Sequence, residues 1–229
     1  METNPVTQAA IAHLGGYVLT SYRDKKGVLH AANAVSALGA WAGVFAHIQA
    51  RALMISGVIP QTENTMLEVK TKQGDTYYFG DAINACLLDG SEAFPAFWNL
   101  AAGAARDPKV ADKIGLLEIA GHTSKSVGTA KFGVPRINAR YKLSERPIDA
   151  VRTHGPLLVR HFLNLQLNPA NLMQVFGATA QHFAMFAAEE ARDVRVNLAL
   201  PRLEIVRLYM ESAIPMSKLD PRAVGMATG

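Results

Sequence analysis

The chain has 229 residues, of which 49% are hydrophobic, 18% are charged and 7% are aromatic. A chain of this length can bury roughly 70% of its unfolded surface, so it needs neither disulfides nor a structural metal to fold. The composition therefore excludes collagen-like, disulfide-scaffold and disordered proteins. The net charge of +4 is concentrated in one segment, 121–146, where six basic residues stand against one acidic residue.

The sequence also indicates where in the cell the protein is located. The single cysteine, Cys86, has no second cysteine to pair with. The first ten residues lack the basic start and apolar run of a signal peptide. The longest uncharged apolar stretch, 31–46, has about 16 residues, fewer than the roughly 20 that span a bilayer. We therefore predict a cytoplasmic protein with no transmembrane helix and no membrane partner.

The N-terminal part of the chain is predicted to be helical. Apolar residues recur at helical spacing over 4–22. An alanine-rich helix is expected to follow over 28–56, because alanine loses no side-chain entropy in a helix. Within it Gly39 and Gly43 stand one turn apart, so this face should allow another backbone to approach closely in a packed core.

The pattern then changes to the period of a β-strand. Leu67, Val69 and Thr71 alternate with charged residues and a Gln-Gly-Asp turn follows, so we expect an antiparallel hairpin over about 66–79. Alternation of apolar and basic residues recurs at about 136–143 and predicts a possible third strand. Since a lone hairpin is marginal in water, this small sheet should rest on helices.

The C-terminal third returns to helical spacing, at 148–153, 156–167, 169–192 and 201–214. We expect a flexible tail from about residue 216. The chain shows neither a repeat of fixed period nor a long linker. We therefore predict a single compact domain over 1–229 of the α+β class, predominantly α-helical, with a helical core and a small antiparallel sheet.

The segment 121–133 is the most chemically suggestive part of the sequence. It is predicted to be a flexible loop whose backbone N–H groups, hydroxyls and ammonium groups could contact the oxygens of an anion. It lacks the spacing of a Walker phosphate-binding loop, so a solvated connection is the alternative. The candidate ligand-binding residues in it are His122, Lys125, Ser126 and Lys131.

Three residues outside this loop could contribute to the same anion site. Arg136 and Arg140 project from one face of the predicted third strand, although basic residues on edge strands also serve to block association. His154 belongs to a basic cluster near a predicted helix start, where an anion would offset the positive helix end.

The sequence holds no pattern for a metal site or a covalent nucleophile. His182 and Glu189 could share a helix face, but no Glu-x-x-His pair completes a metal site. Neither Gly-x-Ser-x-Gly nor Ser-x-x-Lys is present. We therefore assign no catalytic residue and expect no metal and no cofactor.

These observations predict a non-enzymatic binding or assembly module that could hold a small anionic ligand in the 121–146 segment. The alternative is an enzyme acting on a phosphorylated or carboxylated small molecule, with His122 or His154 transferring a proton. A nucleic-acid-binding regulator ranks third, because no recognised nucleic-acid-binding motif is present. The positive mean hydropathy, +0.09, together with the apolar helices, predicts a homo-oligomer.

Overall fold

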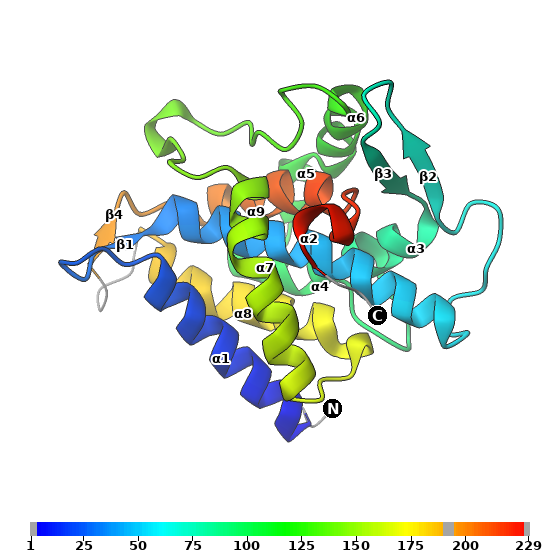
Figure 1. Ribbon diagram of the computed structural model, residues 1–229. Coiled ribbons are helices and arrows are strands. Elements are labelled where there is room, and N and C mark those ends of the chain that lie inside the picture. The colour runs from blue at the N-terminus through cyan, green and yellow to red at the C-terminus, as the bar shows by residue number, and fades with distance from the viewer. Residues whose placement is uncertain (1–3, 190–194, 227–229) are drawn as a thin grey trace.

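A long helix, α2 (Ala31–Ile55), lies at the centre of the protein. The structure, a computed structural model, describes residues 4–189 and 195–226. Figure 1 shows α2 crossing the molecule with the other long helices around it. Of the 25 residues of α2, 18 are buried, so this helix forms the middle of the core. The helices around it include α1 (Pro5–Ser21), α7 (Pro147–Asn164), α8 (Leu172–Ala187) and α9 (Arg202–Met216).

Two glycines allow α9 to lie directly against α2. A Cβ atom on Gly39 would come within 2.5 Å of the backbone oxygen of Tyr209, and one on Gly43 would collide with the backbone oxygen of Ala213. No side chain larger than hydrogen fits at either position while the two backbones keep this separation. The predicted close approach is therefore confirmed, and its partner is α9.

Among the described helices, α2 alone is long and apolar enough to cross a membrane by length and composition. It is longer than the apolar stretch that the sequence suggested, because the helix continues beyond His47 and Arg51. Within its most apolar window, 83% of the residues are buried inside the protein. Burial of this kind is typical of a core helix. The absence of a membrane partner stays a prediction.

The predicted hairpin is confirmed beside the helical core. β2 (Leu67–Lys70) pairs antiparallel with β3 (Thr76–Phe79). On the other edge of β3, the Tyr78 N–H donates to the carbonyl oxygen of Lys218 at 2.7 Å. The protein is therefore predominantly helical with a small antiparallel sheet, as the sequence indicated.

The possible third strand at 136–143 was a wrong prediction. Residues 139–141 form a short 3₁₀ turn, η3 (Ala139–Tyr141), in an otherwise irregular segment. The side chain of Asn138 accepts a hydrogen bond from the Arg140 N–H at 3.0 Å, a local bond that competes with strand pairing. Tyr141 is buried, so the alternating pattern reflects single side chains that dock on the core.

The predicted loop at 121–133 also differs from the structure, since its first half is helical. Helix α6 (Leu116–Ser126) runs through Gly121 and follows α5 (Val110–Ile114) after a break at Gly115. The buried residues of α6 are Ile119, Thr123 and Ser126. Their spacing places them on one helix face, and packing of this face outweighs the cost of one helical glycine.

The remaining elements are short. β1 (Leu29–His30) pairs in parallel with β4 (Val196–Asn197). The others are α3 (Asp81–Asn84), the π-helical turn η1 (Ala85–Asp89), α4 (Phe97–Ala101), and the 3₁₀ turns η2 (Ala102–Ala105), η4 (Pro169–Asn171) and η5 (Pro221–Val224).

Residues 217–226 pack on the core, in contrast to the flexible tail expected from about 216, and the last three residues of that tail lie outside the described residues. Leu219, Val224 and Met226 are buried. The side chain of Asp220 accepts a hydrogen bond from the N–H of Arg222 at 3.0 Å and thereby caps η5. This segment turns beside the C-terminal half of α2 (Figure 1).

We expect Gly43→Ala to destabilise the protein by about 3 kcal/mol, because the added methyl group forces α2 and α9 apart. Chemical denaturation would measure this change in the free energy of unfolding. The matched control is Gly16→Ala in α1, where a Cβ atom meets no other atom within 4 Å. The control should gain about 0.5–1 kcal/mol from the better helix propensity of alanine. Equal effects at the two glycines would contradict the close backbone contact.

Candidate functional site

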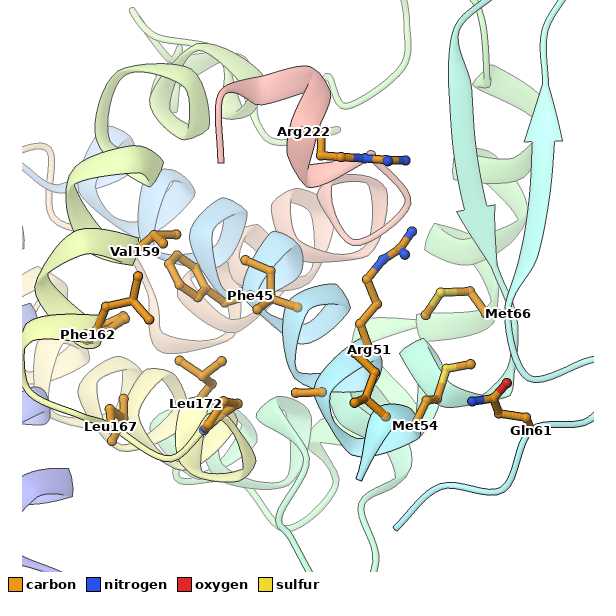
Figure 2. A pocket seen from close by; sticks show the side chains of 15 residues that line it. Phe45, Arg51, Met54, Gln61, Met66, Val159, Phe162, Leu167, Leu172 and Arg222 are labelled. Atoms are coloured by element: carbon orange, nitrogen blue, oxygen red, sulfur yellow. The ribbon is translucent and has the colours of Figure 1, made fainter. Parts of the chain in front are cut away.

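A mostly apolar groove of about 470 Å³ opens beside the C-terminal half of α2. α2 forms one wall, and the end of α7 and the start of α8 form another (Figure 2). Two large apolar residues at the groove, Ile55 and Leu163, are 80% and 70% exposed. The apolar lining comprises Phe45, Ile48, Ala52, Met54, Ile55, Met66, Val159, Phe162, Leu163, Leu167, Pro169 and Leu172. The groove therefore offers an apolar ligand a continuous surface.

Two arginines supply the charge of this groove. Figure 2 shows Arg51 rising from α2 and Arg222 facing it from the C-terminal segment, away from the cluster around Phe162. The Nη2 atom of Arg51 is buried and lacks a hydrogen-bond partner among the described residues. Within the same part of the chain Arg51 has no ion pair within 4 Å. A buried N–H donor without an acceptor is costly, so this guanidinium is suited to an acceptor from a ligand.

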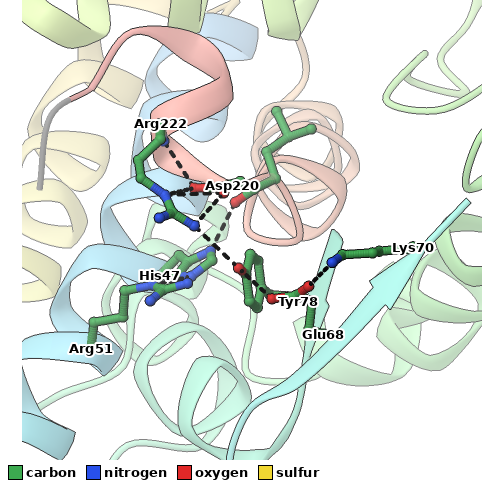
Figure 3. Close-up of polar contacts among 8 residues, drawn as sticks. His47, Arg51, Glu68, Lys70, Tyr78, Asp220 and Arg222 are labelled. Carbon is green, nitrogen blue, oxygen red and sulfur yellow. Dashed lines mark hydrogen bonds and ion pairs between the residues drawn. The ribbon is translucent and has the colours of Figure 1, made fainter. Parts of the chain in front are cut away.

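A chain of contacts holds the Arg51 side chain in place (Figure 3). The Nε–H of Arg51 donates to Nε2 of His47 at 2.8 Å, and Nδ1 of His47 donates to the carbonyl oxygen of Leu219 at 2.8 Å. The guanidinium carbon lies 4.6 Å from the ring centre of Tyr78. Because both nitrogens of His47 and the face of Tyr78 are used, the Arg51 guanidinium is pre-positioned.

The protonation state of His47 follows from this arrangement. Burial, reinforced by the nearby charge of Arg51, lowers the pKa of His47 to about 4. The imidazole is therefore neutral at pH 7, with its proton on Nδ1 and its Nε2 lone pair available to Arg51. A neutral His47 adds no charge to the groove.

Arg222 is the more exposed of the two arginines. Its Nη2 lies 2.9 Å from Oδ2 of Asp220 and 3.5 Å from the hydroxyl of Tyr78. Burial alone would raise the pKa of Asp220, but hydrogen bonds from Arg222 and the charge of Arg51 outweigh it and hold that pKa below its ordinary value. Asp220 is therefore ionised at pH 7.

Among the residues of the contact network in Figure 3, the charges leave one positive charge in excess. The Tyr78 hydroxyl donates to Glu68 at 3.0 Å, and Glu68 in turn pairs with Lys70 at 3.1 Å. The cations of this network are Arg51, Arg222 and Lys70, and its anions are Asp220 and Glu68 (Figure 3). A ligand with a single negative charge would neutralise it.

The residues that the sequence proposed as ligand-binding lie elsewhere, and only some lie together. The structure brings four of them around an open depression of about 500 Å³ at the end of α6, together with Thr129 and Ala130. These four are His122, Lys125, Ser126 and Lys131. Neither Arg136, Arg140 nor His154 lines that depression.

Both arginines of the predicted basic face are already paired. Arg136 makes two ion pairs at 2.8 Å, with Glu118 and with Glu211, whose side chain is only 3% exposed. Arg140 contacts the Tyr141 hydroxyl and pairs with Glu189 at 3.2 Å. Pairing of this kind accounts for much of the local basic charge without a ligand.

His154 belongs to an aromatic cluster between α1 and α7. Its Nδ1 lies 2.7 Å from the Tyr17 hydroxyl, and its ring lies 5.3 Å from that of Trp41. Burial lowers the pKa of His154, against the opposing charge of Glu145. These contacts describe a half-buried histidine held among aromatic rings, apart from the groove beside Arg51.

Sequence patterns did not reveal the groove. Arg51 lies four residues after His47 in an apolar helix, a spacing that places both on one face. The spacing of His47 and Arg51 was the sequence signal that could have pointed to the groove. The contacts with Tyr78 and Leu219 come from distant parts of the chain and leave no local pattern.

The described part of the chain contains no group of three or more His, Cys, Asp or Glu residues that could hold a metal ion. Comparison with family models, with curated proteins and with solved structures finds no match for this chain.

We expect the stability of the protein to fall as the pH is lowered from about 6.5 to 4, in part through His47. The pKa of His47 is lower in the folded state than in the unfolded chain, so protonation favours unfolding. The contribution is fully present above pH 6.5 and is lost as pH falls to the folded pKa, a loss of about 3 kcal/mol.

Chemical denaturation of the protein and of His47→Gln at a series of pH values would measure this loss. The carboxylates titrate in both proteins, so the difference between the two slopes isolates His47. Identical slopes would show that His47 is not buried in its neutral form.

Proposed function

We propose that the protein is a binding module for a small amphiphilic carboxylate, held in the groove beside α2. The observation that carries the proposal is Arg51, a pre-positioned guanidinium with an unpartnered, buried Nη2 at the charged end of an apolar groove. A carboxylate oxygen would supply the missing acceptor, in a charge-assisted hydrogen bond.

Charge and shape together select the ligand class. One excess positive charge suits a monoanion better than a phosphate monoester with two negative charges. A volume of about 470 Å³ lies in the range of small-molecule sites, which combine an apolar lining with a few polar groups. Each buried methylene group would contribute about 0.8 kcal/mol. An alkyl or aryl chain ending in one carboxylate meets both requirements.

The polar groups at the groove support binding over catalysis. Its polar lining residues are Arg51, Gln61 and Arg222. None of these three side chains is a nucleophile or a general base at neutral pH. They can orient a ligand and neutralise it, which is the work of a binding module.

We expect octanoate to bind with one site per chain and 1-octanol, its uncharged analogue, to bind at least tenfold more weakly. The difference arises because a hydrogen bond to a charged group contributes about 1.5–3 kcal/mol. In Arg51→Met the preference for octanoate should largely disappear, while octanol binding stays within a few-fold of its original strength. Isothermal titration calorimetry would measure the four dissociation constants.

The matched control is Arg23→Met, which removes an exposed arginine before the N-terminal end of α2, far along the helix from the groove. This variant keeps the net charge of Arg51→Met and should bind octanoate as the unchanged protein does. Equal affinity for octanoate and octanol, or equal losses in the two variants, would contradict the proposal.

A second candidate place for an anion is the depression at the end of α6, because the structure gathers His122, Lys125, Ser126 and Lys131 there. The carbonyl groups at the C-terminus of a helix attract cations and oppose an anion. The two lysines therefore also complement the helix end without a ligand, and we rank this place below the groove.

A thermal titration with inorganic phosphate tests this second candidate. Phosphate bound at α6 would raise the melting temperature of the unchanged protein by several degrees at 100 times its dissociation constant. It would not do so in a Lys125→Ala, Lys131→Ala variant. Equal shifts in both proteins would indicate a general salt effect and remove support for this site.

Homo-oligomer formation stays a proposal, but the reason for it differs from the one that the sequence suggested. The apolar helices that suggested assembly are largely buried within one chain. Exposed apolar surface remains at the groove, at Ile55 and Leu163. Light scattering in the calorimetry buffer would show whether a second copy, instead of a small ligand, covers this surface.

A further inference from the structure

Lys218, which follows α9, is a buried lysine without a counterion. Its side chain is only 6% exposed. Its Nζ donates to Oδ1 of Asn84 at 3.2 Å and lies 5.5 Å from the ring centre of Phe79. In the described part of the chain no carboxylate lies within 4 Å of Nζ. A charged ammonium group is costly to bury in this way.

Lys218 lines a cavity of about 370 Å³ that is separate from the groove beside Arg51. The wall is formed by the hairpin, α3, η1, α6 and the end of α9. It carries no cation other than Lys218, and its polar residues are Asn64, Asp81, Asn84 and Ser124. The apolar part comprises Leu67, Phe79, Leu87, Leu88, Ala120 and Ile214. A small molecule in this cavity would meet the amine directly.

The surroundings of Lys218 favour the neutral amine. Burial lowers the pKa of Lys218 to about 8, so a substantial fraction of Nζ carries a lone pair at neutral to slightly basic pH. Exposed lysines, with a pKa of about 10.4, hold far less neutral amine there. A desolvated lysine is the usual form of an amine nucleophile in proteins.

The backbone around Lys218 is also fixed. Its N–H donates to the carbonyl oxygen of Pro215 at 3.0 Å, and its own carbonyl oxygen accepts from Tyr78 on β3. The backbone position from which the Lys218 side chain extends into the cavity wall is therefore fixed, and the amine contacts Asn84.

We propose that Lys218 forms an imine with a small uncharged aldehyde or ketone bound in this cavity. The lone pair of Nζ attacks the carbonyl carbon, so that a C–N bond forms and the carbonyl oxygen gains a proton. The carbinolamine then loses its hydroxyl group as water, which carries away the second amine proton, and a C=N bond results. The step is a condensation and needs no oxidant or reductant.

An uncharged compound fits better than an oxo acid. With Asp81 in its wall and Lys218 as its single cation, the cavity has no second positive group for a carboxylate once the amine is consumed. The Arg51 groove differs from this cavity, because Arg51 keeps its positive charge when a ligand binds. The two proposals therefore stand independently.

The test uses propanal and cyanoborohydride, which reduces an imine to a stable secondary amine, followed by peptide mass spectrometry of the full chain. At pH 7.5 we expect Lys218 to be alkylated at least tenfold faster than Lys109, which is exposed at the start of α5. The rate at Lys218 should saturate with propanal concentration, because propanal first binds in the cavity. The rate at Lys109 should stay linear with propanal concentration over the same range.

Two variants complete the experiment. Lys218→Arg keeps a cation but removes the amine, and should lose the fast, saturable labelling while Lys109 still reacts. Lys109→Arg is the matched control and should leave labelling of Lys218 unchanged. If Lys218 reacts no faster than Lys109 in the folded protein, or only after addition of urea, the proposal is wrong, whatever octanoate does at the other site.

Discussion

The contact between the backbones of α2 and α9 is the constraint on which the rest of the structure depends. Gly39 and Gly43 let α9 lie against the central helix with no side chain between them. This contact fixes where α9 ends, and therefore where residues 217–222 leave it. The segment emerges between the C-terminal half of α2 and the hairpin, and both candidate sites lie along it.

Residues 217–222 link elements that are otherwise far apart in the sequence. The carbonyl oxygen of Leu219 fixes the tautomer of His47, which in turn orients Arg51. The carbonyl oxygen of Lys218 holds β3 through Tyr78, whose ring covers the Arg51 guanidinium. Residues 217–222 therefore help to position both the Arg51 guanidinium in the groove and the Lys218 amine in the separate cavity.

Local patterns predicted what depends on local physics. The hairpin near 66–79 followed from alternation and a turn, and the glycine pair followed from its spacing on one helix. The pattern at 136–143 misled because an alternation of apolar and basic residues also arises when Tyr141 docks on the core and Arg136 pairs with Glu211. Arg51 and Lys218 could not be identified, because their roles depend on burial and on partners that tertiary packing supplies.

Arg51 and Lys218 also share an energetic signature. Each places a cation in a partly or fully buried position without an ion pair in the described chain, where an apolar residue of similar length would stabilise the fold. Residues that lower the stability of the fold often mark functional sites. The two conflicts differ in kind, however. At Arg51 the guanidinium stays charged and lacks an acceptor, so an anionic ligand would stabilise it. At Lys218 burial favours the neutral amine, which removes the cost of burying a charge. The same physical cost thus favours binding at one site and covalent chemistry at the other.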